Sequence, residues 1–274
     1  MTPPGPVLSG ATRLYGIVGD PIAQVRSPQV YTQRFAADGL DAVLVPLHVP
    51  AERFESVMPG LLALANLDGL FVTIPFKARM LPLVDRIGAT ARTVGAVNTL
   101  RREADGSWTG DMFDGLGLVR GFERKGVRLA GRRVALFGAG GAGSAIACAL
   151  AEAQVASIDV IDVEARRAEA LVARLAPVFP AVALARAGQG VPAGVDMIVN
   201  ASPVGMRPGD GLPGAIGAVT RGTIIGDVVV SSQPTPIIRL AIEHHCPFVD
   251  GKDLHAGQVE TVLEFLRLDR RPAG

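Results

Sequence analysis

Two ionisable side chains, Lys77 and Asp114, stand out for the chemistry they could perform. Lys77 directly follows the apolar run GLFVTIPF, although only three of the chain's 27 basic residues are lysines. An arginine keeps its proton near neutral pH, whereas a lysine can release it when its site lowers the pKa. With a carboxylate nearby, such a lysine can move a proton at a reacting alcohol. We therefore interpret both as acid–base candidates; the alternative for Lys77 is a solvated charge at a strand end.

The second chemical signal is the stretch GAGGAG, in which Gly138, Gly140 and Gly143 form a G-x-G-x-x-G pattern with Gly141 and Ala142 between them. It follows the apolar run RVALF, which predicts a strand, and precedes SAIACALAEA, which predicts a helix. In that context the glycines permit a tight turn, close approach to a pyrophosphate and close helix–strand packing. The pattern predicts a dinucleotide site, and the alternative is a glycine turn without a cofactor.

The choice between NAD and NADP depends on Asp162, which ends the next predicted strand, SIDVID. A carboxylate there accepts hydrogen bonds from the ribose 2′-hydroxyl of NAD and repels the 2′-phosphate of NADP. Arg166 and Arg167 follow closely and could still admit a phosphate. We expect NAD as the preferred cofactor, with NADP as the alternative.

Histidines and cysteines give weaker signals. His244, His245 and Cys246 are adjacent, so their side chains point in different directions, and the sequence shows no further ligands at metal spacing. We expect a structural role for them and no metal site. His255 lies near the expected site, where it either supports a site residue or simply belongs to the start of a helix.

Composition indicates a well-buried globular protein, with 49% hydrophobic and 19% charged residues. The net charge is +1 without a basic stripe, so neither a nucleic-acid nor a membrane partner is expected. Two distant cysteines predict no disulfide framework. No signal peptide and no run of about 18 apolar residues is seen. We expect a cytoplasmic monomer or homodimer that acts on a small molecule.

The elements that must position these residues alternate between strand and helix. Ser27 is the expected N-cap of a helix that Gly39 ends, and Pro46 is expected to interrupt a strand. FESVMPGLLALAN is expected to form a helix in two pieces. This alternation predicts an α/β fold with parallel strands and a domain boundary near SWTGDMFDG. The other expected elements are strands at RLYGIVG, GLFVTIP, DMIVNAS and TIIGDVVV, and a closing helix at HAGQVETVLEFLRL.

Seven motifs occur in an order that is far more specific than any one of them. They are YGIVGDPIAQVRSP, FVTIPFK, GAVNTL, GDMFDG, GAGGAG, NASPVGM and DGKDLHAGQ. With them the chain resembles the shikimate/quinate dehydrogenase family nearly from end to end. The resemblance implies two domains around a cleft: a substrate-binding α/β domain, residues 1–113 with 251–274, and a Rossmann dinucleotide-binding domain, residues 114–250.

The resemblance also implies roles for individual residues. The catalytic pair falls on Lys77 and Asp114. The substrate-binding positions are Ser27, Thr73, Asn98 and Gln258. The cofactor-binding positions are Gly138, Gly140, Gly141, Ala142, Gly143, Asp162, Asn200, Val228 and Gly251.

The chain departs from the family pattern where polar groups would contact the substrate. Val25 replaces the first of two serines, Phe71 an asparagine, Met112-Phe113 an Asn-Thr pair and Val230 a tyrosine. A buried polar group that loses its partner costs about 1–3 kcal/mol, so good shikimate turnover is not expected.

We therefore expect an NAD-preferring oxidoreductase for a secondary alcohol or ketone on a cyclic or small hydroxy compound less polar than shikimate. Two alternatives stay open: a non-catalytic protein that binds NAD and a metabolite, and an ordinary shikimate or quinate dehydrogenase.

Overall fold

The structure, a computed structural model, describes residues 8–268 of the chain. It consists of two compact units: unit 1 comprises Met1–Met112 and Thr261–Gly274, and unit 2 comprises Phe113–Glu260. Each unit has its own six-stranded sheet. The α/β prediction is confirmed. Within residues 8–268, no helix is both long and apolar enough to cross a membrane.

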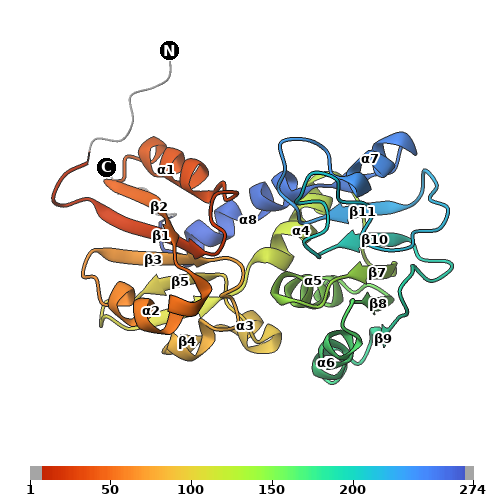
Figure 1. The fold of residues 1–274 in the computed structure, drawn as a ribbon, viewed down its shortest axis with the longest axis horizontal. Coiled ribbons are helices and arrows are strands. Elements are labelled where there is room, and N and C mark those ends of the chain that lie inside the picture. Colours follow the sequence, from red (N-terminus) through yellow and green to blue (C-terminus); the bar gives the residue numbers. More distant parts are fainter. Residues whose placement is uncertain (1–7, 269–274) are drawn as a thin grey trace, which may run out of the picture. The chain divides into compact units, whose positions relative to one another are not determined.

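Unit 1 is a mostly parallel sheet in the order β2-β1-β3-β5-β6-β4. Strand β3 runs parallel to β1 and antiparallel to β5, so the end of β3 lies beside the start of β5. Helix α1 packs beside β2 (Figure 1). The strands are β1 (Arg13–Gly19), β2 (Ala42–His48), β3 (Leu67–Val72), β4 (Arg86–Ile87), β5 (Thr99–Arg102) and β6 (Trp108–Asp111), and the helices are α1 (Ser27–Ala37), α2 (Phe54–Leu62) and α3 (Ala89–Val94).

Three local predictions for unit 1 are wrong. Ser27 is the first residue of α1, and Arg26 is its N-cap residue. Pro46 does not interrupt β2, because β2 is the edge strand of the sheet, where a residue without an N–H is tolerated. Pro59 lies inside α2, which is one helix that a short 3₁₀ turn precedes.

Unit 2 is an all-parallel sheet in the order β12-β11-β10-β7-β8-β9. This is the doubly wound order: from β7 the chain adds β8 and β9 on one side and then β10, β11 and β12 on the other, so the strand order reverses between β7 and β10. The strands are β7 (Arg133–Phe137), β8 (Ser157–Ile161), β9 (Ala183–Arg186), β10 (Met197–Asn200), β11 (Ile224–Asp227) and β12 (Phe248–Val249), and the helices are α4 (Asp114–Arg124), α5 (Gly141–Glu152), α6 (Ala165–Leu175), α7 (Pro236–Glu243) and α8 (Gly251–Phe265), whose last five residues belong to unit 1.

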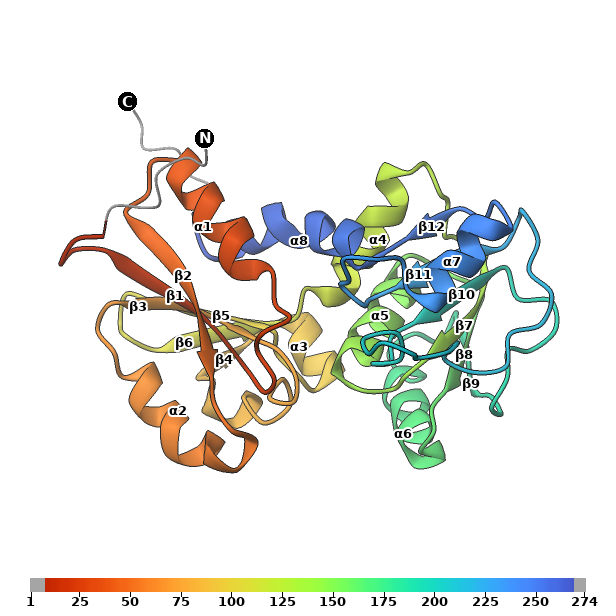
Figure 2. The same cartoon turned by 45° about the horizontal axis from the view of Figure 1, so that its top comes forward.

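Strand β7 shows why this sheet needs helices on both faces. Its side chains alternate between two cores: Val134 and Leu136 join the cluster that α4, α5 and α6 cover, while Ala135 and Phe137 join the cluster that α7 covers. Figure 2 shows α5 and α7 on different sides of these strands. A strand buried on both faces reads as one continuous apolar run, which is why RVALF predicted it correctly.

Candidate active site

Lys77 lies just beyond the carboxyl end of β3, on a segment that is held at several points. The preceding Phe76 is fully buried and its ring centroid lies 4.6 Å from that of Phe54. The backbone N–H of Val97 donates to the Lys77 carbonyl at 3.0 Å. The Lys77 side chain itself is half-buried. The Lys77 backbone is thus held by a buried neighbour and a hydrogen bond, and its side chain is partly shielded from water.

The polar residues expected around the substrate in unit 1 gather at the same edge of the sheet. Thr73 follows β3, and its methyl group would clash with a side chain at Gly19 at the end of β1. Asn98 precedes β5, and its carbonyl accepts from the N–H of Val72 at 2.8 Å. Asn98 and Ser27 are buried, with 6% and 8% of their surfaces exposed. In unit 1, Thr73 and the buried Asn98 thus lie at the edge of the sheet where β3 ends, and Lys77 follows β3 along the chain. The third residue, the buried Ser27, begins α1.

In unit 2, Asp114 is the first residue of α4, where a carboxylate is stabilised by the helix dipole. Two glycines in this helix permit unusually close packing. A Cβ at Gly115 would lie 2.1 Å from the Ala145 carbonyl oxygen of α5, and one at Gly117 would lie 2.6 Å from the Leu254 carbonyl oxygen of α8. Close contact with α8 brings the field of Asp114 to His255, whose pKa burial lowers and the Asp114 charge raises.

The glycine loop has the geometry that a pyrophosphate requires. Gly138 has φ +96°, and a Cβ on Gly143 would lie 1.9 Å from the Gly138 carbonyl oxygen, so neither position accepts a side chain. Gly140 is the N-cap residue of α5, and a Cβ there would meet no protein atom within 4 Å. Gly138 and Gly143 are therefore packed against other protein atoms, whereas the space beside Gly140 is free of protein atoms. Gly141 and Ala142 begin the helix, whose first N–H groups can hold phosphate. The residues fit a dinucleotide.

Asp162 directly follows β8 and holds the loop in place. One carboxylate oxygen accepts from the N–H of Ala139 at 2.7 Å, and the other accepts from the N–H of Glu164 at 2.9 Å. A carboxylate has about four lone-pair sites, so ribose hydroxyls can still bind. Arg166 and Arg167 both pair with the Glu164 carboxylate, at 3.2 and 2.6 Å.

Asn200 and Asp227 end the neighbouring strands β10 and β11 and join through a buried network. Asn200 Nδ2 donates to Asp227 Oδ1 at 2.9 Å, and the Thr235 hydroxyl donates to Asp227 Oδ2. Burial raises the pKa of Asp227 to about 6, although these hydrogen bonds oppose the shift. The network fixes the loops that follow both strands, including Val228.

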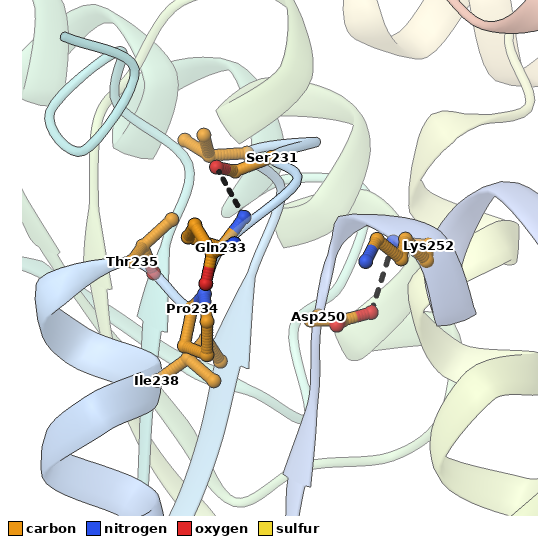
Figure 3. Close-up of a pocket in the computed structure, with 8 residues that line it drawn as sticks. Ser231, Gln233, Pro234, Thr235, Ile238, Asp250 and Lys252 are labelled. Carbon is orange, nitrogen blue, oxygen red and sulfur yellow. Dashed lines mark hydrogen bonds between the residues drawn. The ribbon is translucent and has the colours of Figure 1, made fainter. Parts of the chain in front are cut away.

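A cavity of about 60 Å³ lies beside this network, between the loop after β11 and the start of α8 (Figure 3). At Gly251 the start of α8 lies closest to the loop after β11, because a Cβ there would lie 2.5 Å from the Val229 carbonyl group. The cofactor positions predicted in unit 2 thus all follow strands of one parallel sheet, at its carboxyl edge, where α/β proteins bind nucleotides. Residues 8–268 contain no cluster of three or more His, Cys, Asp or Glu side chains suited to a metal.

Comparison with known proteins agrees with this arrangement. Residues 17–100 match the family model described as the shikimate dehydrogenase substrate binding domain. The NADP⁺ shikimate dehydrogenase of Rubrobacter xylanophilus is 38% identical over 254 residues, which cover 90% of this chain and 88% of that protein. The chain belongs to the shikimate dehydrogenase family.

Solved structures of similar proteins share the fold over nearly the whole chain. The shikimate 5-dehydrogenase of Listeria monocytogenes, in complex with shikimate and NAD, is 27% identical, with a TM-score of 0.82 over 97% of this chain and 95% of that one. The ligand-free 5-ketofructose reductase of Gluconobacter sp. strain CHM43 is 28% identical, with a TM-score of 0.82 over 95% and 94% of the two chains. The predicted membership of the shikimate dehydrogenase family is confirmed.

The departures from the shikimate dehydrogenase pattern differ in their surroundings. Phe71 is 6% exposed and its ring centroid lies 4.6 Å from that of the fully buried Tyr31. Met112 and Phe113 are also buried, whereas Val230 is 37% exposed. Phe71 therefore makes a packed apolar contact in place of a polar side chain.

Sequence reasoning missed Asp227 and Thr235 as members of the site. The sequence did contain a signal for Asp227, because it directly follows the apolar run TIIG. A carboxylate at the end of a buried strand seldom lacks hydrogen-bond donors. The N–H of Val229, two residues on, is one donor; the other two, the side chains of Asn200 and Thr235, reach Asp227 only in the folded unit.

Proposed function

We propose that this protein is an NAD-preferring oxidoreductase that interconverts a secondary alcohol and a ketone on a cyclic or small hydroxy compound less polar than shikimate. One observation carries the proposal. The proton-transfer candidates are both on well-defined segments, Lys77 after β3 and Asp114 at the start of α4, while the packed Phe71 occupies the position of a polar substrate contact. Unit 2 would bind the dinucleotide, and unit 1 would supply most of the substrate contacts; Asp114 and Gln258 belong to unit 2.

The preference for NAD is supported by the charges that follow β8. Asp162 and Glu164 place two carboxylates within three residues, and Glu164 neutralises Arg166 and Arg167. A 2′-phosphate would meet carboxylates and arginines that are already paired, whereas a 2′-hydroxyl can donate to Asp162. The relative from Rubrobacter xylanophilus is named for NADP⁺ and the Listeria structure contains NAD, so similar proteins are found with either cofactor.

In the proposed reaction the bound nicotinamide supplies the acceptor or donor of hydride. The Lys77 amine takes the proton from the alcohol oxygen as the carbon–hydrogen bond breaks, and the lysine returns that proton when the ketone is reduced. Asp114 orients the substrate and the lysine. Ser27, Thr73, Asn98 and Gln258 supply the remaining polar contacts.

The less polar substrate follows from what the site can satisfy. A polar substrate group brought against Phe71 in place of the expected asparagine would lose a hydrogen bond, at a cost of about 1–3 kcal/mol. The similarity to a 5-ketofructose reductase shows that relatives of this fold include a reductase of a compound other than shikimate.

The loss of polar contacts also favours a second candidate, a protein that binds NAD and a metabolite without turnover. Lys77→Ala separates the two. In an enzyme this variant loses nearly all turnover and keeps its affinity for NAD, because Lys77 belongs to the other unit from the glycine loop. A binder has no turnover to lose.

The experiment is a steady-state assay of NADH formation by the purified protein. Shikimate, quinate, apolar cyclic alcohols and small hydroxy acids are compared, with NADP⁺ in parallel and Lys77→Ala as the control. We expect an apolar alcohol to be oxidised with NAD⁺. Full activity on shikimate would refute the substrate proposal, and higher kcat/KM with NADP⁺ would refute the cofactor proposal.

A further inference from the structure

His255 and Gln258 lie three residues apart on α8, so their side chains are neighbours on one face of the helix. Gln258 Nε2 lies 3.3 Å from His255 Nδ1. Helix α4 packs against Gln258, since a Cβ on Gly117 would lie 3.2 Å from the Gln258 Cβ.

The contact with His255 fixes which end of the Gln258 amide faces away from it. An amide presents a donor at its nitrogen and an acceptor at its oxygen. Here the nitrogen donates to His255 Nδ1, which leaves the carbonyl oxygen as the outward group. That oxygen, Gln258 Oε1, is buried and has no hydrogen-bond partner within residues 8–268. A buried acceptor in this state gains from a ligand that donates to it.

We propose that His255 is a positioning residue that holds the Gln258 amide so that its carbonyl oxygen accepts a hydrogen bond from a substrate hydroxyl. The inference rests on the proposed function, which gives Gln258 its contact with the substrate. The selected substrate then carries a second hydroxyl besides the one that is oxidised. Without His255 the amide can turn over and present its NH₂ group, which suits an ether or carbonyl oxygen instead.

The chemistry of the imidazole agrees with this role. Nδ1 accepts a hydrogen bond only while the ring is neutral with its proton on Nε2. Burial lowers the pKa of His255, which favours the neutral ring, and the charge of Asp114 acts in the opposite direction. A neutral histidine is therefore available as the acceptor near neutral pH.

The first test compares two substitutions at one position. His255→Leu removes the acceptor, whereas His255→Asn keeps one, because the asparagine Oδ1 occupies nearly the place of Nδ1. The probes are cis-cyclohexane-1,2-diol and cyclohexanol, which differ by one hydroxyl. His244→Leu, at the exposed end of α7, is the matched control.

We expect the wild-type protein to prefer the diol in kcat/KM. His255→Leu should reduce that preference about two- to tenfold, the value of one hydrogen bond, through KM rather than kcat. His255→Asn should restore it, and His244→Leu should not change it. Equal loss in the Leu and Asn variants, or a preference that neither changes, would overturn the proposal.

The second test does not need turnover. In the full chain labelled with ¹⁵N-histidine, the His255 signals, assigned with His255→Leu, should show the neutral tautomer protonated at Nε2, and Gln258→Leu should shift the Nδ1 signal. A ring protonated at Nδ1 would overturn the proposal. If neither probe nor any other alcohol is oxidised, the proposed function fails, and the tautomer still decides the role of His255.

Discussion

The buried carboxyl of Asp227 makes a quantitative prediction about stability and pH. Its surface is 0% exposed, and burial raises its pKa from 3.8 to about 6, with a smaller contribution from Asp250. The folded protein therefore binds this proton more tightly than the unfolded chain. The stabilising contribution is complete below the unfolded pKa of 3.8 and is lost as pH rises through about 6.

The magnitude follows from the size of the shift. A difference of about two pKa units corresponds to about 3 kcal/mol of unfolding free energy. Asp227→Asn removes the titration and retains the network. The amide oxygen accepts from Asn200 and the Val229 N–H, as Oδ1 does now, and the amide nitrogen donates to a rotated Thr235 hydroxyl.

We therefore expect the wild type to lose about 3 kcal/mol relative to Asp227→Asn between pH 4 and pH 7. Urea unfolding followed by far-UV circular dichroism, at several pH values, measures this difference. The single tryptophan, Trp108, lies in unit 1 and reports that unit by fluorescence as an internal control. A wild-type-minus-variant difference that stays constant with pH would refute the reasoning.

Three further predictions test the site, each with its own variants and measurement. Gly143→Ala should lower the melting temperature, because its Cβ would lie 1.9 Å from a carbonyl oxygen. Gly140→Ala, whose Cβ would meet no protein atom within 4 Å, should melt at the wild-type temperature but bind NAD more weakly in calorimetry. Normal NAD affinity in Gly140→Ala would contradict the phosphate role. Glu164→Ala should free Arg166 and Arg167 and improve kcat/KM for NADP⁺ about tenfold, while Glu169→Ala, which removes the exposed partner of Arg186, should not. Phe71→Asn should destabilise unit 1 by about 3 kcal/mol, since it removes a packed ring, and should raise activity on shikimate; loss of stability without that gain would argue against Phe71 as a substrate contact.

The glycine loop and its strands could be predicted from the sequence because their signals are local. RVALF is apolar at every position after its first residue, and the glycines follow at once, so strand, turn and helix lie within one short segment. Gly143 lies against the Gly138 carbonyl oxygen of the same βαβ unit, whereas the atoms that crowd Gly138 belong to Ala201 and Ser202 of a distant segment. The prediction at the end of β8 was likewise local, since Asp162 directly follows its strand.

The rest depended on contacts between distant segments. Nothing near Asp227 in sequence reveals that Asn200 donates to it, and nothing near Gln258 shows that α4 packs beside it. Pro46 was misinterpreted because its effect depends on whether β2 lies at the edge or in the middle of the sheet, which is a property of the topology.

That edge position of Pro46 also bears on how copies of the chain behave at high concentration. A strand at a sheet edge offers unpaired N–H and C=O groups to the strands of other molecules, which favours aggregation. Proline in an edge strand turns its nitrogen toward solvent and offers no N–H there. At the opposite edge of the same sheet, β4 has only two residues, too few to template another strand. Both edges of the unit 1 sheet are thus protected against edge-to-edge association.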